Sequence, residues 1–296
     1  MKSLCLFSSY YESGEIPYYI RIYLQELVRH NQRVVFISNQ QSLPSDSVAF
    51  LKRFEIHYLP VQDEGYDFGM WSKGLARYPA EEYDRLMLVN DSCVLVRKLD
   101  EVLATIELNK WDYAGLMSSS EVGFHLQSYF LVFSVKAIAS LKIYLNTHGI
   151  QKSMIDVIHT YEVGLAIYMQ QQGLDTGTVF NVEHMRSGFN PIYTFILSLL
   201  DAGFPLIKKK QLFNTFNRKE RLTLLRNGVE AGTDRYLNIL ETSFSGFIDI
   251  KKLKEDRLRY VNKPTLFMLN NYIGMYGVIR RLLGKSTPQQ LTEKAD

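Results

Sequence analysis

Apolar residues gather into short runs that alternate with stretches of helical periodicity. Residues 3–10, 33–39, 54–61 and 83–92 are runs of strand length, and each closes on polar residues or near a proline. Between the first two, residues 16–30 place apolar side chains every three or four positions, as on one face of a helix. Strands that alternate with helices in this way predict an α/β fold with a mostly parallel central sheet.

The second half of the chain is less regular. Residues 124–134 have the aromatic and apolar content of a strand, and residues 136–149 predict a helix that stops at Gly149. A further helix is expected over residues 153–173, again stopped by a glycine. From about residue 190 the sequence is helical in character and increasingly basic.

Charge is distributed unevenly along a chain that is otherwise ordinary in composition. Apolar residues make up 46% of the 296 residues, which is enough for a substantial core. Residues 1–200 carry 16 Lys and Arg against 21 Asp and Glu, whereas residues 201–296 carry 18 against 10. We therefore expect the basic C-terminal part to have a task of its own.

Several classes of protein are disfavoured by what the sequence lacks. It has no phosphate-binding loop, dinucleotide fingerprint or zinc-protease motif, and Cys5 and Cys93 show no zinc-ligand spacing. No apolar run is long enough to cross a bilayer, and the N-terminus does not resemble a signal peptide. We therefore expect a cytoplasmic protein, and we expect no nucleic-acid partner because no binding motif accompanies the basic tail.

Candidate binding residues stand where the predicted strands end. Ligands of parallel sheets bind beyond the carboxyl ends of the strands, and Ser8, Tyr10, Asn39, Asn90 and Asp91 all stand there. The Asp91 carboxylate suits Mg²⁺ or Mn²⁺ bridging a diphosphate, because these cations prefer oxygen ligands. The alternative is a simple turn, since Asn-Asp-Ser is also good turn chemistry.

A glycine-punctuated segment, "GYDFG", adds a second carboxylate. Asp67 lies between Gly65 and Gly69, and glycine permits close approach of the backbone to a ligand. Asp67 and Gly69 are therefore candidates for contacts with a sugar or ribose, and Lys73 for a contact with phosphate. The alternative is an ordinary loop followed by a solvated lysine.

Three further side chains are candidates for the acceptor and the chemistry. His125 and Gln127 alternate along the predicted strand 124–134 and can hydrogen bond an acceptor, although a satisfied core histidine is the alternative. Glu162 is a candidate general base, and the alternative is a first-turn residue that interacts with the helix dipole. His184, in a loop-like stretch, is a candidate for the phosphates or their metal.

These blocks together resemble one known family. The segments "GYDFGMWSKGL" (residues 65–75), "YDRLMLVNDS" (83–92), "FHLQSYFLVFS" (124–134) and "YEVGLAIYMQQQG" (161–173) look similar to the rhamnan synthesis F family of bacterial polysaccharide glycosyltransferases. The resemblance covers about residues 3–215. It implies a GT-A-like fold, in which an α/β sheet binds a nucleotide sugar.

The resemblance also implies roles for particular residues. Asp91 matches the carboxylate that meets the metal and the diphosphate, with Mg²⁺ or Mn²⁺ as cofactor, while Ser92 or Cys93 stands in place of the usual second Asp. Asp67 matches a donor-binding position. Glu162 falls where an inverting enzyme carries its base, and its mechanism would be a single displacement.

The expected organisation is a GT-A-like glycosyltransferase domain over residues 1–215 and a basic helical region over 216–296. The implied donor is a dTDP-rhamnose-like nucleotide sugar, and the implied acceptor is a lipid-linked glycan of the cell envelope, such as O-antigen or capsule. The basic region, which has aromatic residues between its charges, suits contact with the cytoplasmic face of the inner membrane. The alternative function is a non-catalytic GT-A-like subunit of a polysaccharide-assembly complex.

Overall fold

The computed structural model describes residues 1–12, 14–62, 64–120, 122–182, 190–213, 233–244 and 246–260. Two expectations, His184 and the basic stretch beyond residue 260, lie outside these residues.

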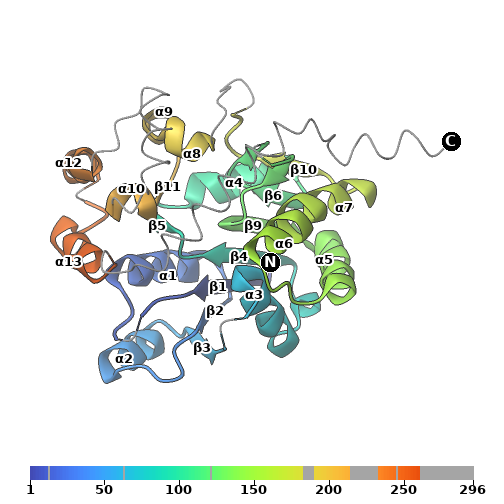
Figure 1. Cartoon of the computed structure of the whole chain (residues 1–296), viewed down its shortest axis with the longest axis horizontal. Helices are drawn as coiled ribbons and strands as arrows, with labels where there is room; N and C mark the ends of the chain where they lie inside the picture. Colours follow the sequence, from blue (N-terminus) through green and yellow to red (C-terminus); the bar gives the residue numbers. More distant parts are fainter. Residues whose placement is uncertain are drawn as a thin grey trace.

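A seven-stranded sheet forms the centre of the molecule (Figure 1). Its strand order is β10-β6-β9-β4-β1-β2-β3, and all neighbouring pairs are parallel except those that β9 makes with β4 and β6. The strands are β1 Ser3–Ser9, β2 Arg33–Ser38, β3 His57–Pro60, β4 Arg85–Asn90, β6 Tyr113–Gly115, β9 Phe130–Ser134 and β10 Thr176–Thr178. The predicted α/β fold with a mostly parallel sheet is therefore confirmed.

Two short sheets flank the large one. In the first, β11 (Leu206–Lys208) runs antiparallel to β5 (Cys93–Leu95), which follows β4 almost directly. In the second, β7 (Ser118–Ser119) pairs with β8 (His125–Leu126). The stretch 124–134, expected as one strand, is thus divided into β8 and β9 by a turn at residues 127–129.

Helices cover both faces of the sheet. The α-helices are α1 Tyr18–His30, α2 Ser45–Arg53, α3 Tyr66–Arg77, α4 Asp100–Asn109, α5 Val135–His148, α6 Met154–Val157, α7 Leu165–Gln171, α8 Pro191–Thr194, α9 Ile196–Asp201, α10 Lys209–Phe213, α12 Thr233–Ser243 and α13 Ile250–Tyr260. A 3₁₀ turn, η1, spans Ala80–Glu82, and a π-helix, η2, spans Ile158–Gly164. Helix α2 has no counterpart among the predicted elements.

Residues of β1 alternate between two apolar layers. Cys5 and Phe7 pack in the layer that holds α1, α2, α4, α8, α9, α10, α12 and α13. Leu4 and Leu6 pack in the layer that holds α3, α5, α6 and α7. Because both faces are covered, the strands are apolar without interruption, which is why they stood out in the sequence.

The last described helices belong to the first of these layers. Figure 1 shows α12 and α13 near α1 and α10, away from α5 and α7. Leu240 of α12 and Leu253 of α13 are fully buried in the layer that includes Leu24 of α1. The proposed division of the chain at residue 215 stays a prediction. Within the described part of the chain, none of the helices is long and apolar enough to cross a membrane.

A side chain from α13 completes the start of α1. The residue before α1 is Pro17, which offers no side-chain cap. Instead, Tyr19 N–H donates to Asp256 Oδ2 at 3.0 Å, and Asp256 is only 5% exposed. This carboxylate accepts from an amide in the first turn of α1, as an N-cap side chain does.

We expect Asp256→Ala to lower the free energy of unfolding by about 1–2 kcal/mol, because it removes that acceptor. Asp256→Asn keeps an oxygen in place and should cost less. Denaturant titration measures both, and the exposed neighbour Glu255 supplies the control variant Glu255→Ala. Equal midpoints for Asp256→Ala and Glu255→Ala would contradict the capping role.

Candidate functional site

Polar side chains meet at the carboxyl ends of β1, β2 and β4, which we call the carboxyl edge. The register pairs Ser8 with Asn90, and Ser9 with Ser38. Because β9 runs the other way, its amino end lies at the same edge, where Asn90 N–H donates to Tyr129 O at 3.3 Å. The strand ends that were expected to converge therefore lie side by side.

Asp67 is held at this edge by two strand-end residues. Ser8 Oγ donates to Asp67 Oδ1 at 2.9 Å, and Asn90 Nδ2 donates to Oδ2 at 2.7 Å. The Asn90 amide is fixed in that orientation because its oxygen accepts from Ser92 N–H at 3.1 Å. Gly65, with φ of 75°, turns the chain into α3 so that Asp67 lies in the first helical turn.

The surroundings of Asp67 raise the pKa of its carboxyl group to about 6. Burial is the largest cause, and repulsion by the Asp91 carboxylate adds to it. The hydrogen bond from Ser8 and the charges of Lys209 and Lys208 act in the opposite direction. A carboxyl group with this pKa changes charge in the physiological range, as groups at functional sites often do.

Asp91 lies on the other side of β4 in a buried ion pair. Its Oδ2 accepts from Lys209 Nζ at 2.9 Å, from Ser9 Oγ at 3.0 Å and from the Tyr19 hydroxyl at 3.1 Å. The side chains of Asp91 and Lys209 are only 10% and 7% exposed. Sequence reasoning missed Lys209, whose only signal was its place in the basic run that follows β11.

This environment does not fit a divalent cation on Asp91. The carboxylate already faces an ammonium group, and a second positive charge there would repel Lys209. The residues that stand in place of a second acid are Ser92 and Cys93, and burial raises the pKa of the Cys93 thiol. His184, the other expected ligand, lies outside the described residues, so its role stays a prediction.

A different acidic group has ligand-like spacing. Donor atoms of Glu26, His30 and Asp100 lie within 4.8 Å of one another. Arg29 already bonds both Glu26 and Asp100, at 2.7 Å and 3.2 Å. The group also lies at the amino ends of the strands, where Ser3 Oγ donates to His30 O, and is therefore at the opposite edge from Asp91.

Glu162 lies in the π-helix rather than at the start of a helix. The helical segment begins at Met154 and runs through Ile158–Gly164, so the expectation of a first-turn Glu is wrong. Ser128 Oγ donates to Glu162 Oε1 at 2.6 Å, and His125 Nε2 lies 3.8 Å from Oε2. Glu162 remains 21% exposed. π-Helical turns are frequent at functional sites because they shift side chains out of the regular helical stripe.

The segments that carry Asp67 and Glu162 pack directly against each other. Phe68 stacks on Tyr161, with ring centroids 4.8 Å apart and an interplanar angle of 10°. Ser128, which holds Glu162, also precedes the Tyr129 carbonyl that bonds Asn90. The two carboxylates therefore belong to adjoining parts of one region.

His125 and Gln127 bond to each other instead of lining one strand. The Asn190 oxygen caps α8 by accepting from Ile192 N–H, so its Nδ2 donates to Gln127 Oε1 at 3.0 Å. Gln127 Nε2 then faces His125 Nε2 at 3.1 Å, and His125 Nδ1 faces the Gly123 carbonyl at 2.8 Å. This chain of bonds assigns the proton of neutral His125 to Nδ1.

Two more expected donor residues lie at the carboxyl edge. Asn39 follows β2, and its side chain bonds the backbone of Tyr11 through both Oδ1 and Nδ2, at 3.2 Å and 3.1 Å. Asn39 thus fixes the loop after β1. Tyr10, in that loop, is half exposed.

Lys73 and Gly69 lie on α3 and serve the loop before it. Lys73 Nζ bonds Gln62 O at 2.9 Å and pairs with Glu64 at 3.3 Å. A Cβ on Gly69 would lie 1.9 Å from the Glu64 carbonyl oxygen, so only glycine fits. These contacts give both residues a structural role, and their donor contacts stay predictions.

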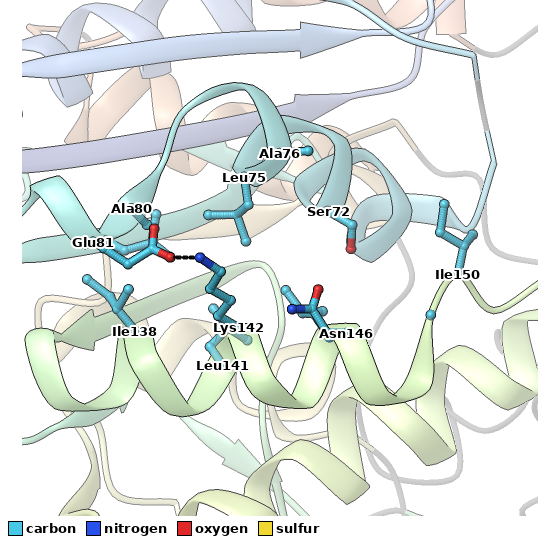
Figure 2. A pocket seen from close by; sticks show the side chains of 13 residues that line it. Ser72, Leu75, Ala76, Ala80, Glu81, Ile138, Leu141, Lys142, Asn146 and Ile150 are labelled. Carbon is cyan, nitrogen blue, oxygen red and sulfur yellow. Dashed lines mark hydrogen bonds and ion pairs between the residues drawn. The ribbon is translucent and has the colours of Figure 1, made fainter.

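A cavity of about 330 Å³ lies elsewhere, between α3 and α5 (Figure 2). Its walls are mainly aliphatic, and an ion pair between Glu81 and Lys142 lies across it. None of the expected site residues that the structure describes lines this cavity. It is therefore separate from the carboxyl edge.

We expect the raised pKa of Asp67 to make the folded protein less stable as the pH rises from about 4 to 6, with the full loss present above pH 6. The unfolded carboxyl group loses its proton near pH 3.8, whereas the folded one keeps it until about pH 6. The folded state therefore loses stability as the pH rises from 4 to 6, by roughly 3 kcal/mol at most. Asn at position 67 can replace the protonated Asp67. Its oxygen can accept from Asn90 Nδ2, and its amide nitrogen can donate to the Ser8 hydroxyl, which can donate or accept.

Denaturant titrations of Asp67→Asn and the wild type at several pH values test this. The variant should gain stability over the wild type between pH 4 and 6, and the gain should stay constant above pH 7. Asp201→Asn, at the exposed end of α9, is the control. A gain in stability that does not change with pH would show that folding does not raise the pKa of the Asp67 carboxyl group.

Comparisons with known proteins came to three findings. A protein described as a nucleotide-diphospho-sugar transferase from Desulfovibrio desulfuricans G20 matches 76% of this chain and 98% of its own, with 15% identity and a TM-score of 0.42. A cytidylyltransferase from Leptospira borgpetersenii matches 76% and 93%, with 11% identity and a TM-score of 0.39. No curated protein matches the sequence. The model of the family described as rhamnan synthesis protein F matches residues 34–263, most of the 296-residue chain, so the chain belongs to that family.

Proposed function

We propose that the protein is an inverting glycosyltransferase. It moves a sugar, rhamnose or a related deoxysugar, from a nucleoside-diphosphate donor to a growing cell-surface polysaccharide. The observation that carries the proposal is the pair of carboxylates, Asp67 and Glu162, on adjoining segments of one region. Membership of the rhamnan synthesis F family supports the same class of reaction.

The donor binds at the carboxyl edge in this proposal. Asp67 accepts from a hydroxyl of the ribose or the sugar, since both of its oxygens are already oriented by Ser8 and Asn90. Tyr10 and Asn39 shape the neighbouring loop. A dTDP-rhamnose-like nucleotide sugar agrees with membership of the rhamnan synthesis F family. Binding of dTDP, UDP and GDP identifies the nucleotide.

Glu162 acts as the general base. It takes the proton from the acceptor hydroxyl, and that oxygen attacks the anomeric carbon as the bond to the diphosphate breaks. Ser128 orients one carboxylate oxygen at 2.6 Å and leaves the other toward His125. His125 and Gln127 bond each other, and Gln127 also bonds Asn190. To contact the acceptor, either side chain must break one of these hydrogen bonds and form a new one with the acceptor.

A second candidate is a non-catalytic subunit that keeps the fold to bind a nucleotide sugar or glycan. The engagement of Asp91 by Lys209 favours it, because a residue expected to meet a metal is occupied. Turnover separates the two candidates.

We expect Glu162→Gln to lower sugar transfer by about 100-fold or more while donor affinity changes less than about threefold, because the base acts on the acceptor. Transfer and release of nucleoside diphosphate are measured with dTDP-rhamnose and a panel of other nucleotide sugars. Exposed Glu82 supplies the control, Glu82→Gln. Absence of turnover in the wild type with every donor would favour the non-catalytic subunit, and loss of donor affinity in Glu162→Gln would make Glu162 a structural residue.

The acceptor is proposed to be a lipid-linked glycan, with the protein held at an anionic membrane surface by its basic part. Lys251, Lys252 and Lys254 are exposed on α13, while Leu253 between them is buried. Lysines near an anionic surface contribute about 1 kcal/mol each. This surface is available without disturbing the packing of α13 on the core.

We expect the full chain to bind anionic liposomes at low salt and to release them toward about 0.5 M salt, where screening is strong. Replacing Lys251, Lys252 and Lys254 with Gln should weaken binding about tenfold or more. Sedimentation with anionic and neutral liposomes measures this. Binding that ignores salt, lipid charge and the three substitutions would reject the electrostatic contact.

A further inference from the structure

We infer that Lys208, anchored by the buried pair of Lys209 and Asp91, supplies the positive charge that binds the donor's diphosphate in place of a divalent cation. The inference rests on the proposed function, because it concerns the leaving group of that reaction. It assigns a diphosphate-binding role to a residue that the motifs of the sequence did not mark.

Lys208 lies beside the turn that ends β4. It is the last residue of β11, and the antiparallel register sets it opposite Cys93 of β5. Its Nζ donates to Ser92 Oγ at 3.1 Å and lies 4.4 Å from the centroid of the Tyr129 ring. Ser92 follows Asp91 directly, so the ammonium group lies at the carboxyl edge.

The charge of Lys208 is not neutralised by a neighbouring acid. Within the described ranges, no carboxylate lies within 4.0 Å of its Nζ, and its contacts are the Ser92 hydroxyl, the Cys93 thiol and the face of the Tyr129 ring. Lys73, Lys142 and Lys209 each have such a carboxylate. Lys208 is also partly exposed, so an anion can reach it.

The Lys209–Asp91 pair fixes where Lys208 stands. Lys209 N–H donates to Ser92 O at 3.0 Å, while its ammonium group bonds Asp91 and the Tyr19 hydroxyl. Backbone and side chain of Lys209 thus tie the end of β11 to the turn after β4. Asp91 is therefore a positioning residue, because its negative charge pairs with Lys209 and does not contact the donor.

The electrostatic field at Asp67 supports this placement. Both Lys208 and Lys209 lower the pKa of the Asp67 carboxyl group, so both lie within electrostatic reach of it. A donor whose ribose or sugar contacts Asp67 would therefore bring its phosphates into the same positive field. Of the two lysines, Lys209 is paired with Asp91, so the ammonium group of Lys208 is the one that has no carboxylate within 4.0 Å among the described residues.

The chemical role of Lys208 is limited to charge. The bond between the anomeric carbon and the diphosphate oxygen breaks, and its electron pair stays on that oxygen. The ammonium group of Lys208 donates a charge-assisted hydrogen bond to the developing anion and keeps its proton. The proton of the acceptor goes to Glu162, so atoms and charges balance.

Equilibrium binding of dTDP, UDP and GDP tests the inference, first in EDTA and then with excess MgCl₂. We expect the wild type to bind one of them in EDTA, with an affinity that Mg²⁺ changes less than about threefold. Lys208→Met, which keeps an unbranched side chain but removes the charge, should weaken that binding by about 10- to 100-fold. Lys208→Arg should restore most of it.

Two controls separate charge from structure. The matching nucleoside, which lacks phosphates, should bind Lys208→Met as it binds the wild type. Lys136→Met removes an exposed lysine from the first turn of α5, at the opposite edge of the sheet, where β9 ends beside Arg85, and should leave diphosphate binding unchanged. A parallel loss of nucleoside binding in Lys208→Met would mean that the substitution disturbs the site as a whole, and would overturn the inference.

The remaining outcomes are also decisive. Binding that requires Mg²⁺, or equal diphosphate affinity in Lys208→Met and the wild type, overturns the role of Lys208 while the proposed transferase stands. If the wild type binds none of the three diphosphates under either condition and turns over no nucleotide sugar, the proposed function fails and the inference fails with it.

Discussion

The contact between Lys209 and Asp91 is the interaction on which the rest of the carboxyl edge depends. Four elements meet in it, because Ser9 ends β1, Asp91 follows β4, Tyr19 belongs to α1 and Lys209 begins α10. Removing one partner of a buried pair leaves an uncompensated charge and costs roughly 3–5 kcal/mol. The pair therefore holds these four elements together at the carboxyl edge. It also leaves neither the Asp91 nor the Lys209 charge unpaired for a ligand.

Much of the edge follows from sequence because parallel strands bring their ends together. Ser8 and Asn90 close separate apolar runs, and the register sets them opposite each other. Asp67 was singled out by its flanking glycines and does lie against both residues. For these positions, local pattern and sheet topology are sufficient.

Other parts of the site could not be read from local pattern. Lys209 lies 118 residues from Asp91 in sequence, and nothing near either residue signals that they pair. The sequence therefore suggested that Asp91 could bind a metal, whereas in the structure its carboxylate pairs with Lys209. The turn between His125 and Phe130 was also hidden, since an aromatic and apolar run resembles a continuous strand. The π-helix around Glu162 keeps an apolar face, so its periodicity resembles that of an ordinary helix.

The capping of α1 by Asp256 has a consequence for biosynthesis. Tyr19 and Asp256 are 237 residues apart, and Tyr19 also bonds Asp91 through its hydroxyl. The ribosome synthesises β1, β2 and β4 long before α13, so the capping hydrogen bond at the start of α1 can form only after that helix has been made. A chain that ends before α13 therefore lacks the carboxylate that accepts from the Tyr19 amide, on the same residue whose hydroxyl bonds Asp91.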